Sequence, residues 1–328
     1  MDYGQIVTKA FRTIWRYKYL WWLGLLATFA GEGGVGFPNP SGLEDLKGAE
    51  FREVTDWIAA NLALLISLAV VVGLIMLVLF FIGVIAKGGL IAAVNKIQRG
   101  EPTWFGDGFR AGVAAFWRML GVTLAISLPL VILFGGLAGG GYLLLDGEQY
   151  TAAVILLLVA FLPCLILLAY AQLLYNYATR FAVLQGLGSF ASISQAHGMM
   201  MRCKGESLVI WLIYLGLAIG IQMALGVAMI LMLIPIIVIF GTAFAAAGLG
   251  GLTGGSTGAS GLFGALGAGL IVLIIFVIIV GLVAIMLGGI VAAFNSSFWT
   301  FAFLELLARA FPPTQVLPEE PQIGGVPA

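Results

Sequence analysis

The chain alternates long apolar runs with short polar segments, and the runs exceed the length that strands or core helices of soluble domains require. Residues 57–86, 119–145, 150–179, 207–247 and 262–304 contain no Asp, Glu, Lys or Arg. About 20 apolar residues in a helix cross a ~30 Å hydrocarbon core, so each run predicts a membrane-spanning helix. The shorter run 19–30 follows an amphipathic stretch that extends it, and we expect a sixth span there.

Composition supports this interpretation. Of the 328 residues, 62% are Ala, Val, Ile, Leu, Met, Phe, Trp, Tyr or Cys, and only 9% are charged. A soluble domain carries about 25% charged residues. The sequence therefore predicts an all-α, polytopic transmembrane helical bundle without a charge-rich aqueous module. Fifteen basic and fifteen acidic residues cancel, so no global charge would recruit nucleic acid.

The basic residues predict the orientation, because Lys and Arg collect on the cytoplasmic flanks of spans. With the N-terminus inside and six spans, 13 of the 15 basic residues fall on the inner side, and only Lys47 and Arg52 fall outside. Both termini are therefore predicted to be cytoplasmic. The basic start could resemble a signal peptide, but Phe11, Trp15 and Tyr17 at helical spacing favour a retained interfacial helix.

Two runs are long for a single crossing. Segments 207–247 and 262–304 have 41 and 43 residues, which as helices would be roughly 60 Å long. Either each helix projects beyond the bilayer or each run conceals a pair of spans. Arg202 and Lys204 precede the first of these runs and Arg309 follows the second, and basic residues are expected on the same side of the membrane. The chain must then cross an even number of times between them, and two crossings are the simplest solution. Pro235 predicts a kink.

The predicted inner segments resemble one another. FRTIWRYKYLWWLGLLA, FRAGVAAFWRMLGVTLA and ISQAHGMMMRCKGESLVIWLIYLG each place basic residues before an apolar helical face, and Asn95, Asn176 and Asn295 fall at matching points of the returning spans. We expect a membrane domain over 1–309 with three hairpin repeats at about 1–99, 100–182 and 190–309. Constraints shared by all membrane proteins are the alternative explanation. Residues 310–328 predict a flexible, Pro-rich cytoplasmic tail, and the Gly-rich stretch 245–269 a flexible outer loop.

The segment WFGDGFRAGVAAFWRML predicts an amphipathic helix along the inner membrane surface. Phe105, Phe109, Val113, Phe116 and Trp117 recur at helical spacing, while charged residues occupy other positions. Basic residues of the inner segments are candidate contacts with anionic lipid. They are Arg12, Arg16, Lys18, Arg110 and Arg118.

Three segments carry a family resemblance: IWRYKYLWWLGLL, GGLIAAVNKIQRGEPTWFGDGFRAG and RFAVLQGLGSFASISQAH. The middle one combines a Gly-x-Pro turn, an aromatic residue and a helix restart. Over most of residues 1–309 the chain resembles the six-helix membrane-domain group that includes the membrane region of glycerophosphoryl diester phosphodiesterases and many uncharacterised prokaryotic membrane proteins. The catalytic barrel of those phosphodiesterases has no counterpart in this sequence, so the resemblance implies a prokaryotic inner-membrane module and no hydrolase.

Candidate chemistry is sparse. The one histidine, His197, lies near Met199, Met200, Met201 and Cys203, and a Met-rich interfacial helix explains this better than a soft-metal site. Catalytic motifs are absent, so we expect neither an enzyme nor a metal or cofactor. The two cysteines, Cys164 and Cys203, are predicted to lie at different depths without a disulfide.

Polar side chains inside the spans are the remaining candidates, namely Gln172, Asn176, Gln222 and Asn295. They could form hydrogen bonds between helices or line a polar cavity. Glycine-rich faces such as 135–140 and Gly216-xxx-Gly220 could pack helices or mediate self-association.

The sequence favours a non-enzymatic membrane protein that organises lipid or partner proteins. Its expected partners are membrane lipids and other membrane proteins, with no nucleic acid. Two alternatives stay open: a passive channel or transporter for a small neutral or amphiphilic solute, and an accessory subunit of a larger membrane complex. A continuous polar path through the four polar positions would favour transport.

Overall fold

The computed structural model of the chain describes residues 2–30, 57–58, 60–147, 149–252 and 258–311, and their regular structure is helical throughout. The predicted all-α class is thereby confirmed for these residues. The elements are α1 (Tyr3–Arg16), α2 (Tyr19–Ala27), the 3-10 helix η1 (Thr28–Ala30), α4 (Leu62–Gln98), α5 (Phe105–Asp146), α6 (Tyr150–Leu184), α7 (Ser189–Arg202), α8 (Lys204–Leu252) and α9 (Gly258–Ala310).

Five helices of the described residues are long and apolar enough to cross a membrane. Their qualifying parts are Leu62–Gln98, Phe105–Asp146, Tyr150–Leu184, Lys204–Met232 and Ile278–Ala310, and Tyr19–Ala30 is a shorter apolar helix. These five correspond to the five long apolar runs of the sequence. The predicted sixth span would depend on Tyr19–Ala30.

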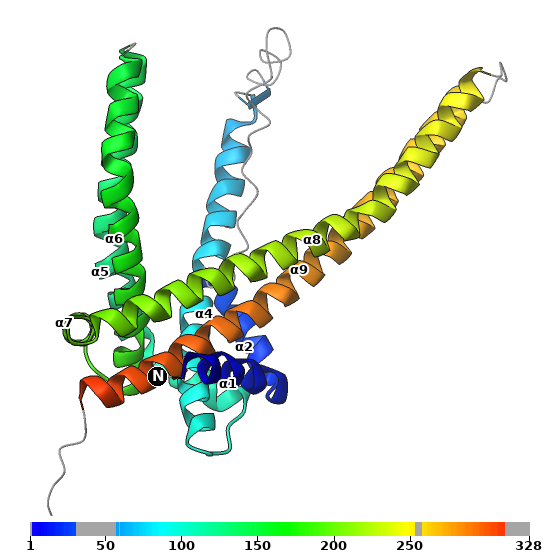
Figure 1. Cartoon of the computed structure of the whole chain (residues 1–328). Coiled ribbons are helices and arrows are strands. Elements are labelled where there is room, and N and C mark those ends of the chain that lie inside the picture. The colour runs from blue at the N-terminus through cyan, green and yellow to red at the C-terminus, as the bar shows by residue number, and fades with distance from the viewer. Residues whose placement is uncertain (1, 31–56, 59, 148, 253–257, 312–328) are drawn as a thin grey trace, which may run out of the picture.

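The helices are joined at one end of the molecule and diverge toward the other (Figure 1). We call the joined end the base, comprising residues 2–30, 80–122, 170–217 and 288–311, where nearly all buried side chains lie. From the base rise three arms: the distal part of α4, the α5–α6 pair and the α8–α9 pair (Figure 1). Large apolar side chains such as Leu74, Val131 and Leu158 are exposed along the arms, as expected for surfaces that face lipid.

The two longest predicted runs form single continuous helices. The 49 residues of α8 and the 53 of α9 correspond to roughly 75 and 80 Å, and α8 continues through Pro235. The alternative of a concealed pair of spans in each run is therefore wrong. The prediction of a flexible loop over 245–269 is also wrong for its greater part, because α8 ends only at Leu252 and α9 begins at Gly258. Residues 253–257, and the predicted tail from residue 312, lie outside the described residues.

The predicted Gly-x-Pro turn forms as expected. Gly100 has a φ of 75°, and the amides of Gly100 and Glu101 donate to the carbonyls of Ile97 and Lys96 at 3.0 Å each. This is the Schellman arrangement that ends α4. Pro102 follows, and α5 restarts directly after Trp104.

Glycines bring the helices of the base into backbone contact. A Cβ on Gly89 of α4 would lie 2.7 Å from the carbonyl oxygen of Gly108 of α5, and a Cβ on Gly88 would lie 3.2 Å from the Cα of Gly112. Gly24 of α2 and Gly289 of α9 form an equally close pair. Small residues of this kind allow helices to associate where lipid removes the hydrophobic driving force.

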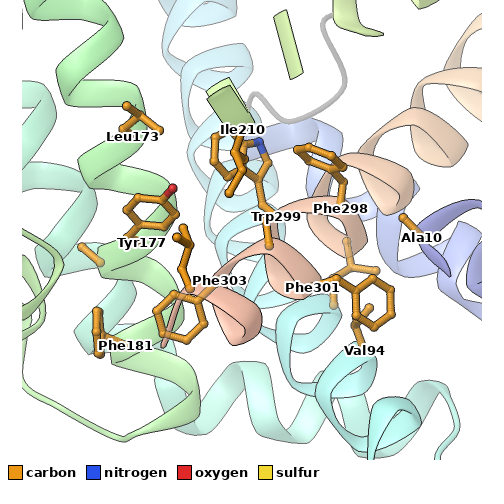
Figure 2. Packing of buried hydrophobic residues seen from close by; sticks show 14 of the residues in the cluster. Ala10, Val94, Leu173, Tyr177, Phe181, Ile210, Phe298, Trp299, Phe301 and Phe303 are labelled. Atoms are coloured by element: carbon orange, nitrogen blue, oxygen red, sulfur yellow. The ribbon is translucent and has the colours of Figure 1, made fainter. Parts of the chain in front are cut away.

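An aromatic cluster fills the space between α6, α8 and α9 (Figure 2). Tyr177 and Trp299 have ring centroids 5.9 Å apart, Phe181 and Phe303 4.9 Å, and Tyr214 and Trp299 5.1 Å. Edge-on and tilted geometries of this type add to the stabilisation that burial provides. The base is thus a packed core, in contrast to the separated arms.

Candidate functional site

Two cationic side chains lie inside the base. Lys87 of α4 and Arg180 of α6 are each 1% exposed. A charged side chain that is buried in a packed protein interior must be paired or hydrogen-bonded to be tolerated, so these two residues mark a candidate functional site. Lys87 and Arg180 therefore form the centre of the candidate functional site.

Arg180 ties α6 to α9. Its Nη1 donates to the carbonyl oxygen of Asn176 at 2.6 Å and to the Oδ1 of the same residue at 3.2 Å. Its Nη2 donates to the carbonyl oxygen of Ser296 at 3.2 Å. The planar guanidinium can satisfy several acceptors in fixed directions, and its bond to Ser296 links α6 to α9.

Lys87 ties α4 to α6 in a different way. Its Nζ lies 4.0 Å from the centroid of the Tyr175 ring, a cation–π distance. The ring takes part in holding the ammonium group away from water. Both buried cations therefore converge on α6 within about two turns of helix.

The apolar runs end at residues 86 and 179, so the sequence predicted Lys87 and Arg180 on inner connections and did not predict their burial. In the structure both lie within continuous helices, because α4 continues to Gln98 and α6 to Leu184, and both are buried in the base. The overlooked signal is that apolar residues resume after each cation, as GGLIAAV after Lys87 and FAVL after Arg180.

Four buried polar atoms lie in the base near Arg180. The hydroxyls of Tyr177 and Ser207 face each other, and the Ser296 Oγ and the Trp299 Nε1 have no hydrogen-bond partner among the described residues. In Figure 2 the Tyr177 hydroxyl and the indole nitrogen of Trp299 both point toward the side on which Ile210 lies. All four groups can donate a hydrogen bond, and Trp299 can only donate. These groups are enclosed by the protein and form part of the polar interior of the base.

The four polar positions predicted from the sequence fall into separate environments. Asn176 is buried and accepts from Arg180, while its Nδ2 donates to the carbonyl of Gln172 at 2.9 Å. Gln172 is exposed and accepts from the Nε1 of Trp211 at 3.1 Å. Asn295 is half-buried next to Ser296, and Gln222 is exposed on α8, about 16 Å along the helix from Trp211. The structure brings Asn176 and the Asn295 region together but leaves Gln222 apart.

The predicted lipid-contact residues lie mainly on the surface of the base. Arg12, Arg16, Lys18 and Arg110 are exposed. Arg118 is half-buried, and its Nη2 donates to the carbonyl of Ala114 at 3.2 Å. Four of the five are thus accessible to lipid headgroups.

The prediction of a separate surface helix over 104–120 is wrong. These residues are the first turns of α5, which continues without a break to Asp146. The face that packs is formed by Gly108, Gly112, Ala115 and Met119, whereas Trp117 of the predicted apolar face is 78% exposed. Because α4 approaches α5 closely at Gly108 and Gly112, the glycine side of α5 faces α4. By contrast, α1 and α7 are separate short helices.

No group of three or more His, Cys, Asp or Glu that could hold a metal ion occurs within the described ranges. His197 is exposed, and its Nδ1 lies 2.7 Å from the Tyr170 hydroxyl in a hydrogen bond. Cys164 and Cys203 are free thiols, as predicted. His197 therefore joins α7 to α6.

Five long apolar helices that leave large apolar surfaces exposed define a multi-pass, α-helical membrane protein. Comparison with family models, curated proteins and solved structures finds no match for the chain. The resemblance to the six-helix membrane-domain group stays a prediction.

Proposed function

We propose that the chain is a non-enzymatic, six-span protein of a prokaryotic cytoplasmic membrane, with both termini in the cytoplasm, that binds anionic lipid through its base. One observation carries this proposal. All thirteen described Lys and Arg residues lie in the base, together with five of the six described acidic residues, whereas the arms are apolar. Lys and Arg collect on the cytoplasmic side of membrane proteins, where anionic lipids are also concentrated.

Helix α1 has the surface that this function needs. Its apolar stripe of Ile6, Ala10 and Ile14 is buried, and the helix packs against α9. Away from that stripe, Phe11 and Trp15 are exposed, with ring centroids 5.8 Å apart. Arg12 and Arg16 are exposed beside these aromatic residues. Aromatic rings at headgroup level next to cations are typical of a helix at the membrane interface.

The separation of the polar positions supports lipid binding over transport. Asn176 donates a hydrogen bond within α6, Gln172 accepts one from Trp211 of α8, and Gln222 lies on the exposed surface of an arm. A passive pathway would require these groups to line one continuous cavity.

The test is the ratio of phosphatidylglycerol to phosphatidylcholine that co-purifies with the full chain from mixed membranes. We expect the wild type to enrich the anionic lipid. Each cation near an anionic surface contributes about 1 kcal/mol, or roughly fivefold in affinity, so R12E together with R16E should abolish the enrichment from this site. The matched control, R12K with R16K, keeps the charge and should keep the ratio. An unchanged ratio in the charge-reversed protein would contradict the proposal.

A further inference from the structure

We propose that a groove between α6, α7 and α8 binds a single anionic phospholipid, with its phosphate at Lys204 and one acyl chain along α6 and α8. This inference rests on the proposed function in one respect, since the base must face the leaflet that contains anionic lipid. The groove is a second lipid site, remote in sequence from the cations of α1, and its ligand is an anionic phospholipid.

The groove has the size and lining of a ligand site. Its volume is about 440 Å³, within the range of roughly 300–1,000 Å³ usual for small-molecule sites. The lining is mainly apolar and comes from three helices. It consists of Leu165, Ile166, Ala169, Tyr170, Leu173, Met200, Met201, Lys204, Ser207, Leu208 and Trp211.

The polar groups are concentrated at one end of the groove. Lys204 is exposed at the first residue of α8, beside the end of α7. On α6 the lining extends from Leu173 back to Leu165, about 12 Å toward the arms. Ile166 and Leu208 are exposed apolar side chains of this wall. A phospholipid in the leaflet beside the base has its phosphate at the interface and its acyl chains toward the bilayer centre. Its polar and apolar parts therefore match the polar end and the apolar wall of the groove.

Lys204 and Ser207 give one end of the groove its polar lining. Ser207 is 2% exposed, and its hydroxyl faces the buried hydroxyl of Tyr177, one helical turn beyond the lining residue Leu173. Phosphodiester oxygens only accept hydrogen bonds, so they complement the exposed Lys204 ammonium.

Side-chain hydrogen bonds link the three walls. The Tyr170 hydroxyl and His197 Nδ1 join α6 to α7 at 2.7 Å, and the Trp211 Nε1 donates to Gln172 Oε1 at 3.1 Å and joins α8 to α6. Tyr and Trp are the residues enriched at the depth of lipid headgroups. Met200 and Met201 add flexible side chains that can adapt to an acyl chain.

The experiment uses the full chain in phosphatidylcholine nanodiscs that contain a phosphatidylglycerol with a photoreactive diazirine in its acyl chain. Peptide mass spectrometry then maps the cross-links. We expect them to concentrate on the lining residues of α6 and α8 and to be displaced by unlabelled phosphatidylglycerol but not by phosphatidylcholine. Cross-links spread evenly over the arms, or displacement by either lipid alike, would overturn the proposal.

Two variants test the ends of the groove separately. K204Q should weaken competition by phosphatidylglycerol about fivefold, and A169W should fill the chain-binding part and remove the groove cross-links. Their matched controls are R99Q, which removes the exposed cation that follows the last residue of α4, and A224W, which enlarges an exposed residue of the α8 arm. If the controls reduce the cross-links as much as K204Q and A169W do, the site is not this groove.

The inference and the proposed function fail in different ways. If the protein with R12E and R16E loses the enrichment of anionic lipid but keeps the groove cross-links, the result supports both the proposed function and the groove inference. Groove cross-links in a wild-type protein that shows no overall enrichment would contradict only the proposed function. Enrichment without groove cross-links would contradict only the inference.

Discussion

At the scale of single residues, Asn176 is the acceptor that makes a buried guanidinium tolerable. It provides both its carbonyl oxygen and its Oδ1 to Arg180, at 2.6 and 3.2 Å. A hydrogen bond to a charged group contributes about 1.5–3 kcal/mol, and a buried donor left without its acceptor also loses its solvation. The side chain of Asn176 is therefore more important for stability than its modest size suggests.

We predict that N176A lowers the free energy of unfolding by about 2 kcal/mol, because Arg180 loses its Oδ1 acceptor in a buried setting. The measurement is titration of the detergent-solubilised protein with sodium dodecyl sulfate, followed by loss of helical circular dichroism. Q222A is the control, since Gln222 is exposed on α8, and it should change the value by less than about 0.5 kcal/mol. Equal effects of the two substitutions would contradict this role.

The thiol of Cys203 is suited to a pH test of the base. Cys203 ends α7 and is buried, and burial, followed by the nearby carboxylate of Glu206, raises its pKa above the ordinary value. The neutral thiol is therefore favoured in the folded protein. It adds to stability below the ordinary pKa of a cysteine, and that contribution is lost as the pH rises through the elevated folded pKa.

Because the thiolate is the nucleophile, we predict that alkylation of Cys203 by iodoacetamide increases at higher pH in the folded chain than in the chain unfolded in sodium dodecyl sulfate. The experiment uses a C164A background so that only Cys203 reacts. Labelling is quantified by mass spectrometry over a series of alkaline pH values. Superimposable pH profiles for the two states would show that the base does not bury the thiol.

At the scale of helices, the crossing of α4 and α5 depends on glycine. A Cβ on Gly112 would overlap the carbonyl oxygen of Ile85, and a Cβ on Gly108 would lie 3.2 Å from the carbonyl oxygen of Gly89. Backbone atoms cannot move aside as a flexible side chain can. The two helices would have to separate to admit a larger residue.

We predict that G112L lowers the free energy of unfolding by at least about 1–3 kcal/mol through overpacking. G139L on the same helix is the matched control, because a Cβ there would meet no atom of the described chain within 4 Å. The same detergent titration measures both proteins. If G139L proves the more damaging, the exposed glycine face 135–140 takes part in contacts between molecules, as the sequence also allows.

The same glycines explain which parts of the fold the sequence could predict. The five long apolar helices and the turn at Gly100 and Pro102 were predictable, because length, hydropathy and local turn chemistry are encoded by neighbouring residues. The packing face of α5 was not. Of the predicted apolar face, Phe105, Phe109 and Phe116 pack against the core, whereas Val113 and Trp117 are exposed. The closest approach to α4 is made by Gly108 and Gly112, whose role depends on a partner helix.

The candidate site was predictable only in part, for a related reason. Asn176 was identified from its polarity within an apolar run. The burial of Lys87 and Arg180 was not predicted, because each charge was taken to end an apolar run. Lys87 lies against Tyr175 and Arg180 against Asn176. Burial of these cations depends on how the helices pack, which cannot be read from one run of residues.

At the scale of the whole molecule, a charged, packed base and apolar, diverging arms (Figure 1) define an orientation. The turn between α5 and α6 lies at the end of an arm, and the turn between α4 and α5 lies in the base. If the base is cytoplasmic, these two turns lie on opposite sides of the membrane. Gln149 in the first turn and Arg99 in the second are both exposed and can report on the two sides.

We predict that Q149C is labelled in intact cells by a membrane-impermeant maleimide, and that R99C is labelled only after the membrane is opened. The expectation follows from the location of all thirteen described Lys and Arg residues in the base and from their preference for the cytoplasmic side. A background of C164A and C203A removes the native thiols. Labelling of R99C in intact cells with protection of Q149C would invert the orientation. It would also place the groove beside Lys204 in the outer leaflet, where the surface potential that favours anionic lipid at this site is missing.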